Sequence, residues 1–264
     1  MMLKKRLIPT LLLKNGQLVR SERFEVHQVL GNPIHEVERF NQWSVDELIY
    51  LDISDDEWID GRLDMKVQRS DSVLDILEAI SERCFMPLTF GGRIRSLDDM
   101  RARISRGADK ITLNTAAMST PELISLGART FGSQAIVVAI DAASRDDGRW
   151  EVMLEHGRRG TGWTPADWAR ESERLGAGEI LLQSVDRDGT GLGYDVELIR
   201  SVTSATSIPV IALGGVGTLD HFATAVNEAG ASAASAANIF HFVELSDRRA
   251  KRAMAKAGVD VRQL

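Results

Sequence analysis

Short apolar runs rich in β-branched residues recur along the chain and alternate with amphipathic stretches. Each run is apolar at nearly every position, which is typical of strands in a parallel sheet that is covered on both faces. One further run, Ala231 to Ala237, consists of small residues with weak β propensity, so only the rhythm of the chain predicts a strand there. The other seven predicted strands are Arg6 to Leu13, Glu47 to Ile53, Met86 to Phe90, Lys110 to Asn114, Ala135 to Asp141, Glu179 to Ser184 and Ile208 to Leu213.

Between these runs, apolar residues recur with the spacing of amphipathic helices. Strand and helix alternate throughout, and eight such units favour a parallel sheet closed into a (β/α)₈ TIM barrel. The predicted fold is therefore α/β, with residues 1–264 forming a single barrel domain. The predicted helices are Pro33 to Trp43, Ser72 to Arg83, Leu97 to Arg106, Pro121 to Phe131, Pro165 to Leu175, Val196 to Ala205, Leu219 to Glu228 and Glu244 to Lys256.

The two halves of the chain resemble each other. The segment from Phe90 to Asp98 begins Phe-Gly-Gly, and the segment from Leu213 to Asp220 begins Leu-Gly-Gly and ends with the same Leu-Asp pair. The two glycine pairs lie almost half the chain apart, which predicts two similar half-barrels. Two unrelated strand-to-helix turns that both require glycine are the alternative.

Composition narrows the class of protein. Of 264 residues, 44% are apolar, and 32 Lys and Arg oppose 38 Asp and Glu for a net charge of −6. Without any run of five like charges, nucleic acid binding is not expected, whereas a local site for a small phosphate is still possible. Cys84 is the single cysteine, so no internal disulfide can form, which fits the cytoplasm. No apolar segment approaches the roughly 20 residues that span a bilayer, so no membrane insertion is expected.

Candidate chemistry gathers where the predicted strands end, which is the catalytic face of a TIM barrel. Gly91-Gly92 and Gly214-Gly215 each separate a strand from a helix, and bare backbone N–H groups there can bind an anion. Asn114-Thr115 and Asp188-Gly189 add polar donors at the same rim and favour a ligand with two phosphates. Tight turns alone would also explain the glycines, and Asp188 could simply be a turn residue.

Asp141 ends the fifth predicted strand, where a lone carboxylate facing the mouth of the barrel is a candidate general acid or base. A helix-capping role is the alternative. Asp52 ends the second strand in the same way. The histidines have no spacing typical of metal ligands, so no metal and no cofactor is expected.

Ten motifs together resemble the cyclase subunit (HisF) family of imidazole glycerol phosphate synthase, from the first strand to the last. They are Arg6-Leu-Ile-Pro9, Asp46-Glu-Leu-Ile-Tyr-Leu-Asp52, Gly91-Gly92, Gly107-Ala-Asp-Lys110, Asn114-Thr115-Ala116, Val138-Ala-Ile-Asp141, Gly176-Ala-Gly-Glu179, Asp186-Arg-Asp-Gly-Thr-Gly191, Gly214-Gly215 and Phe240-His241.

The resemblance implies a barrel whose N-terminal face binds a glutaminase (HisH-like) subunit as a heterodimer. Ammonia would pass through the barrel to a precursor with two phosphates, which is cleaved and cyclised. Of the two catalytic aspartates of the family, the resemblance identifies Asp141 as one. Leu12 occupies the position of the other, in Pro9-Thr-Leu-Leu-Leu13, and a leucine cannot transfer a proton.

The resemblance also assigns phosphate-binding positions on both sides of the mouth. Asn238 replaces a serine at the last of them, and Ser54-Asp55-Asp56 replaces the usual Thr-Ala-Ser after the second strand, which puts the identity of the substrate in doubt. The implied phosphate positions are Gly92, Asn114, Thr115, Asp188, Gly189, Gly214, Gly215, Ala237 and Asn238.

At the opposite end of the barrel, the resemblance implies a charged ammonia gate and a docking residue, Asp109. The gate residues are Arg6, Glu47, Lys110 and Glu179. Stabilising ion pairs at the base of a barrel are the alternative explanation of these four charges.

This sequence combines an intact gate with Leu12 at a catalytic position. In this combination it resembles the HisF-like paralogues that act with a glutaminase and an amidotransferase in surface-polysaccharide biosynthesis. There, an acetamido group of a sugar becomes an acetamidino group. Two alternatives stay open. Authentic histidine biosynthesis needs a replacement carboxylate such as Asp52 or Glu22, and a scaffold that only conducts ammonia needs no catalytic residue.

Overall fold

The computed structural model describes residues 4–42, 45–54, 72–242 and 246–262. Eight parallel strands close into a barrel, because each pairs with the next and the last pairs with the first. The predicted (β/α)₈ barrel is confirmed, including the eighth strand of small residues. In barrel order the strands are β1 (Arg6–Lys14), β4 (Leu48–Asp52), β5 (Leu88–Gly91), β6 (Lys110–Leu113), β7 (Ile136–Ser144), β10 (Glu179–Ser184), β11 (Val210–Leu213) and β12 (Ala233–Ala236).

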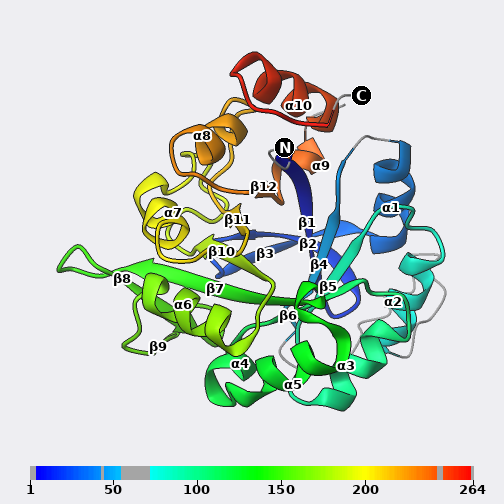
Figure 1. Ribbon diagram of the computed structural model, residues 1–264. Coiled ribbons are helices and arrows are strands. Elements are labelled where there is room, and N and C mark those ends of the chain that lie inside the picture. The colour runs from blue at the N-terminus through cyan, green and yellow to red at the C-terminus, as the bar shows by residue number, and fades with distance from the viewer. Residues whose placement is uncertain (1–3, 43–44, 55–71, 243–245, 263–264) are drawn as a thin grey trace.

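Helices surround the strands on the outside of the barrel (Figure 1). Lys5 forms a bridge with Val261, so the two ends of the described chain lie side by side. Two short helices, α4 and α9, were not among the predicted helices. The helices are α1 (Pro33–Gln42), α2 (Val73–Ser81), α3 (Leu97–Ile104), α4 (Thr115–Ser119), α5 (Glu122–Phe131), α6 (Pro165–Leu175), α7 (Val196–Thr203), α8 (His221–Asn227), α9 (Ile239–Phe242) and α10 (Ser246–Lys256), with a 3₁₀ turn, η1 (Ser133–Ala135).

Helix α6 shows how local sequence sets element boundaries. The Thr164 side chain accepts a hydrogen bond from the Asp167 N–H, and Pro165 occupies the first turn, where no N–H is needed. Gly176 ends the helix in a left-handed conformation with φ of 107°. The predicted range, Pro165 to Leu175, is therefore correct at both ends.

The alternation of side chains along the strands creates two apolar layers. On β1, Leu7 and Leu11 pack in the large core cluster that contains residues of the helices. Ile8 belongs to a separate cluster with Ile49 and Val137, from β4 and β7. Since successive residues of a strand face opposite sides, the second cluster fills the inside of the barrel.

Two hairpins in the loops between barrel strands were missed by the sequence analysis. Antiparallel β2 (Gln17–Glu22) and β3 (Val26–Gly31) follow β1 through a tight turn at Asn15 and Gly16, both with positive φ. Strand β8 (Trp150–Leu154) pairs with the end of β7 and with β9 (Arg159–Gly160). A pattern of fully apolar runs does not predict these strands, because they are partly exposed and contain polar residues.

Most predicted boundaries agree with the structure within two residues. The seventh predicted strand corresponds to β11, which starts at Val210 rather than Ile208. Pro209 precedes it and has no N–H to donate to the sheet. The predicted ends at Trp43 and Glu244 lie outside the described residues. The glycine pairs end β5 and β11, four strands apart in the barrel, as the predicted duplication requires. Among the described residues, no helix combines the length and apolar character needed to cross a membrane.

Candidate active site

A cavity of about 520 Å³ lies at the C-terminal ends of the barrel strands. Leu12, Asp52 and Asp141 reach it from the C-terminal halves of β1, β4 and β7, although β7 continues beyond the predicted end at Asp141 to Ser144. The hairpin β2 and β3 contributes Ser21 and His27 to its lining. In a TIM barrel this end carries the chemistry, so the cavity is the candidate active site.

Asp141 has the electrostatic character of an acid–base residue. Burial raises its pKa from 3.8 to about 7, against a hydrogen bond from Asn114 that lowers it and the charge of Asp188 that raises it further. The Asn114 Nδ2 lies 2.9 Å from the Asp141 Oδ2. Near neutral pH, such a carboxyl group populates both of its protonation states, which suits proton transfer.

Leu12 lines the same cavity but brings no polar group to it. Its side chain is 6% exposed, and its cross-strand partner Leu51 also lines the cavity, with Ala139 and Leu181. The position that the resemblance assigns to a second catalytic carboxylate is thus part of an apolar wall.

Asp52 and Glu155 are the other carboxylates in the described lining. Burial raises the pKa of Asp52, although hydrogen bonds from Ser54 act in the opposite direction. The hydroxyl of Ser54 lies 2.6 Å from Oδ1 of Asp52. Asp52 is therefore a buried carboxylate in the same cavity as Asp141. It is the candidate to replace the catalytic carboxylate that is missing at Leu12.

One predicted set of phosphate-binding residues comes together in the cavity. Gly92, Asn114 and Thr115 all line it, from the ends of β5 and β6. Gly92 has φ of +98°, and a Cβ there would lie 2.0 Å from the carbonyl oxygen of Asp52. The chain therefore requires glycine at this position, whether or not an anion binds to it.

The other predicted set lies outside the lining of this cavity, and three of its members lie against the β2 and β3 hairpin. The Asp188 carboxylate accepts hydrogen bonds from the Ser21 hydroxyl at 2.8 Å and from the Phe24 N–H at 3.2 Å. Asn238 donates to the Ser21 carbonyl at 2.9 Å, and a Cβ on Gly189 would lie 2.6 Å from that oxygen. Asp188 and Asn238 thus hold the hairpin in place, and Gly189 allows the close approach of its backbone. The remaining members of this set are Gly214, Gly215 and Ala237.

Four charged side chains form a ring at the opposite end of the barrel. Arg6 Nη1 lies 2.6 Å from Glu47 Oε1, and Arg6 also pairs with Glu179. Lys110 Nζ lies 2.8 Å from Glu47 Oε2 and 3.1 Å from Glu179 Oε2. Burial raises the pKa of Glu47, but Arg6 and Lys110 outweigh it and hold that pKa below its ordinary value. The ring brings together all four predicted gate residues.

The sequence matches the family described as "Histidine biosynthesis protein" over residues 6–246. It is 44% identical to the imidazole glycerol phosphate synthase subunit HisF of Caulobacter vibrioides over 262 residues, which cover 99% of this chain and 97% of the relative. The HisF subunit of Gluconacetobacter diazotrophicus is 43% identical over 261 residues, with the same coverage. This chain belongs to the HisF family. The resemblance of its motifs to that family is therefore confirmed.

Asp109 lies at the same end of this HisF-family barrel as the charged ring. It directly precedes Lys110 at the start of β6, and its residue is exposed. Its Oδ2 accepts a hydrogen bond from the Leu88 N–H at 2.8 Å. The predicted docking residue is thus accessible on the N-terminal face, while its carboxylate is held in one orientation.

The cavity residues that were not singled out from the sequence include three arginines, Arg93, Arg95 and Arg158. Arg93 lies in the segment from Phe90 to Asp98, and its charge next to two glycines was the available signal. Arg158 reaches the cavity from a hairpin that the sequence analysis did not predict. Within the described part of the chain, no cluster of three or more His, Cys, Asp or Glu residues could hold a metal ion. The predicted departure at Ser54-Asp55-Asp56 lies mostly outside the described residues.

Proposed function

We propose that this HisF-family chain is the synthase subunit of a glutamine amidotransferase. It receives ammonia from a glutaminase (HisH-like) partner at its N-terminal face and supports its addition to an acceptor in the cavity. The observation that carries the proposal is the arrangement of two features at opposite ends of one barrel. The charged ring of Arg6, Glu47, Lys110 and Glu179 lies at one end, and Asp141, with its pKa of about 7, lies at the other.

The interior between these ends supports a route for ammonia. Ile8, Ile49 and Val137 form an apolar layer inside the barrel, and Leu181 of the same cluster also lines the cavity. An ammonium ion would lose its hydration in such a layer at high cost, whereas neutral ammonia would lose much less. The ring would have to separate one ion pair for a molecule to pass.

Asp141 would act as the acid–base residue of the reaction. Its Asn114 hydrogen bond orients the carboxylate, and Gly92, Asn114 and Thr115 would bind a phosphate of the acceptor. The names of the relatives favour the imidazole glycerol phosphate synthase reaction, in which the acceptor is a precursor with two phosphates. For this chain, that reaction requires Asp52 to replace the group missing at Leu12.

Leu12 itself favours a second acceptor. General acid–base groups contribute typically 10²-fold to 10⁴-fold, so a cyclase that lacks one of a pair would be severely impaired. The alternative acceptor is a sugar of surface-polysaccharide biosynthesis whose acetamido group becomes acetamidino, with a third amidotransferase protein taking part. A scaffold that only conducts ammonia would not need the raised pKa of Asp141.

Ammonia-dependent turnover of the two-phosphate precursor of histidine biosynthesis tests the acceptor. We expect Leu12→Asp to raise turnover by about 100-fold or more, since it restores a carboxylate to the apolar wall. Leu12→Asn is the matched control, because it adds a polar group of the same size that cannot transfer a proton. High turnover by the unmodified chain, with no gain in Leu12→Asp, would favour Asp52 as the relocated group. Turnover by none of the three would favour a sugar acceptor.

A further inference from the structure

The loop that follows β5 places an arginine in a backbone conformation that favours glycine. Arg93 has φ of +57°, in the left-handed region, directly after Gly92. A side chain with a Cβ rarely adopts this conformation, and glycine would adopt it without strain. The Arg93 residue lines the cavity. A strained residue at a cavity is a reason to ask what its side chain does there.

Contacts behind the loop hold this conformation. Arg103 is 5% exposed, and its guanidinium donates to the carbonyl oxygens of Gly92 at 3.3 Å and Asp99 at 3.2 Å. The N–H of Arg95 donates to the Asp99 Oδ2 at 2.9 Å. The backbone on both sides of Arg93 is therefore anchored to helix α3. This anchoring keeps Arg93 and Arg95 together at the rim of the cavity.

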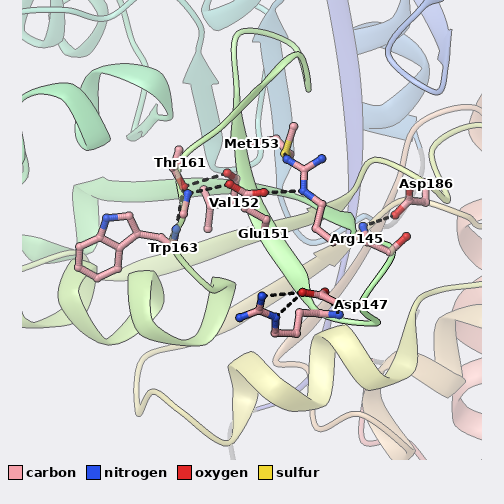
Figure 2. A network of polar contacts seen from close by, with 11 residues as sticks. Arg145, Asp147, Glu151, Val152, Met153, Thr161, Trp163 and Asp186 are labelled. Atoms are coloured by element: carbon pink, nitrogen blue, oxygen red, sulfur yellow. Dashed lines mark hydrogen bonds and ion pairs between the residues drawn. The ribbon is translucent and has the colours of Figure 1, made fainter.

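A third arginine reaches the same cavity from the hairpin of β8 and β9. Arg158 donates from its N–H to the Leu154 carbonyl and from its Nε to the Glu155 carbonyl, both at 3.0 Å. The hairpin is stabilised by the network in Figure 2, in which Arg145, directly after β7, pairs with Glu151 of β8. Glu151 also accepts from the N–H of Gly162 at 2.7 Å.

We propose that Arg93, Arg95 and Arg158 form a subsite for an oxyanion of the acceptor. The subsite is additional to the phosphate positions at Gly92, Asn114 and Thr115, and it rests on the proposed function because it shares the same cavity. Guanidinium groups bind phosphate and carboxylate through paired hydrogen bonds. The described lining of the cavity contains these three arginines together with the carboxylates Asp52, Asp141 and Glu155. The arginines would bind the oxyanion of the acceptor, which is a phosphate or a carboxylate.

Calorimetric titration of the full chain with three probes tests this subsite. The probes are ribose 5-phosphate, glucuronate and uncharged ribose, which separate phosphate, carboxylate and sugar recognition. We expect Arg93→Gly to weaken binding of the preferred oxyanion probe at least tenfold without changing the response to ribose. Because glycine relieves the positive φ, the thermal midpoint of Arg93→Gly should not fall. A purely structural arginine would change stability and leave the preference for the oxyanion intact.

Matched variants complete the experiment. Arg101→Gln is the control, since Arg101 is exposed on α3 and pairs only with Asp98 in the described contacts, at 2.7 Å. Arg95→Gln should weaken the same probe as Arg93→Gly, and Arg93→Lys should retain part of the affinity. Equal affinity in wild type and Arg93→Gly would overturn the subsite, as would no binding of either oxyanion by the wild type at millimolar concentration. If the chain binds the oxyanion probe but shows no ammonia-dependent turnover, the result would contradict the proposed function and leave the subsite supported.

Discussion

Two opposing effects act on the carboxyl group of Asp141. Burial disfavours its charged form, and the hydrogen bond from Asn114 favours it. Burial is the larger effect, so the pKa rises to about 7. A pKa near the working pH lets one residue accept and return a proton, which is the property that a lone acid–base group at this cavity requires.

Because ionised Asp141 is less stable in the folded chain than in the unfolded chain, it should cost stability as the pH rises. The cost is absent below the ordinary pKa of 3.8, grows between there and about 7, and is complete above that value. We expect Asp141→Asn to stabilise the chain at pH 8 by on the order of 2 kcal/mol more than at pH 5. Urea denaturation at the two pH values measures this, with exposed Asp146→Asn as the control. An equal effect at both pH values would contradict the raised pKa.

At the scale of elements, the hairpin of β2 and β3 depends on a distant loop. An isolated two-stranded hairpin is marginally stable in water, so its position needs tertiary contacts. Asp188 supplies them through Ser21 and Phe24, and Asn238 adds a bond to the Ser21 carbonyl. These contacts place the hairpin over the second predicted phosphate set.

Removal of the Asp188 carboxylate should release this hairpin while the barrel remains folded. Loss of its hydrogen bonds costs about 1 to 3 kcal/mol, which corresponds to roughly 5-fold to 150-fold faster amide exchange in residues 17–31. Hydrogen–deuterium exchange of Asp188→Ala measures the change. Arg20→Ala is the control, because it removes an exposed cross-strand bond to Gln28 at 2.8 Å and a contact with the Phe242 ring but leaves the bonds of Asp188 intact. Unchanged protection in Asp188→Ala would show that other contacts hold the hairpin.

At the scale of the whole molecule, the charged ring closes the base of the barrel. Its four members come from the starts of β1, β4, β6 and β10 and balance two positive against two negative charges. Glu47 and Glu179 are both buried, and the cationic partners of Glu47 hold its pKa below its ordinary value.

Loss of one cation should disturb both stability and the passage of ammonia. Arg6→Ala leaves two buried carboxylates with Lys110 alone, and we expect a loss of about 3 to 5 kcal/mol in the free energy of unfolding. With the glutaminase partner present, glutamine-dependent product formation should fall while output with added ammonium salts persists. Arg6→Lys, which keeps the charge, is the control. An equal loss with both nitrogen donors would contradict the role of the ring as a gate.

Much of this architecture could be predicted because its signals are local. The limits of α6 follow from Thr164, Pro165 and Gly176, and the apolar runs identify the barrel strands. Parallel strands in a closed barrel share one C-terminal rim, so the ends of the predicted strands already placed Asp141 and Asn114 at the same rim, where the structure joins them by a hydrogen bond. The eighth strand, Ala233–Ala236, has weak intrinsic β propensity and followed only from the repeat of the units.

The remaining features arise from contacts between residues far apart in the chain. The pairing of Asp188 with Ser21, the presence of Arg158 and Arg93 in the lining of one cavity and the closure of the ring by Arg6 and Glu179 depend on how the barrel closes. The pKa of Asp141 likewise depends on its burial in the finished fold. Local spacing selects the elements and the residues at their ends, whereas distance, burial and charge balance exist only once those elements pack together.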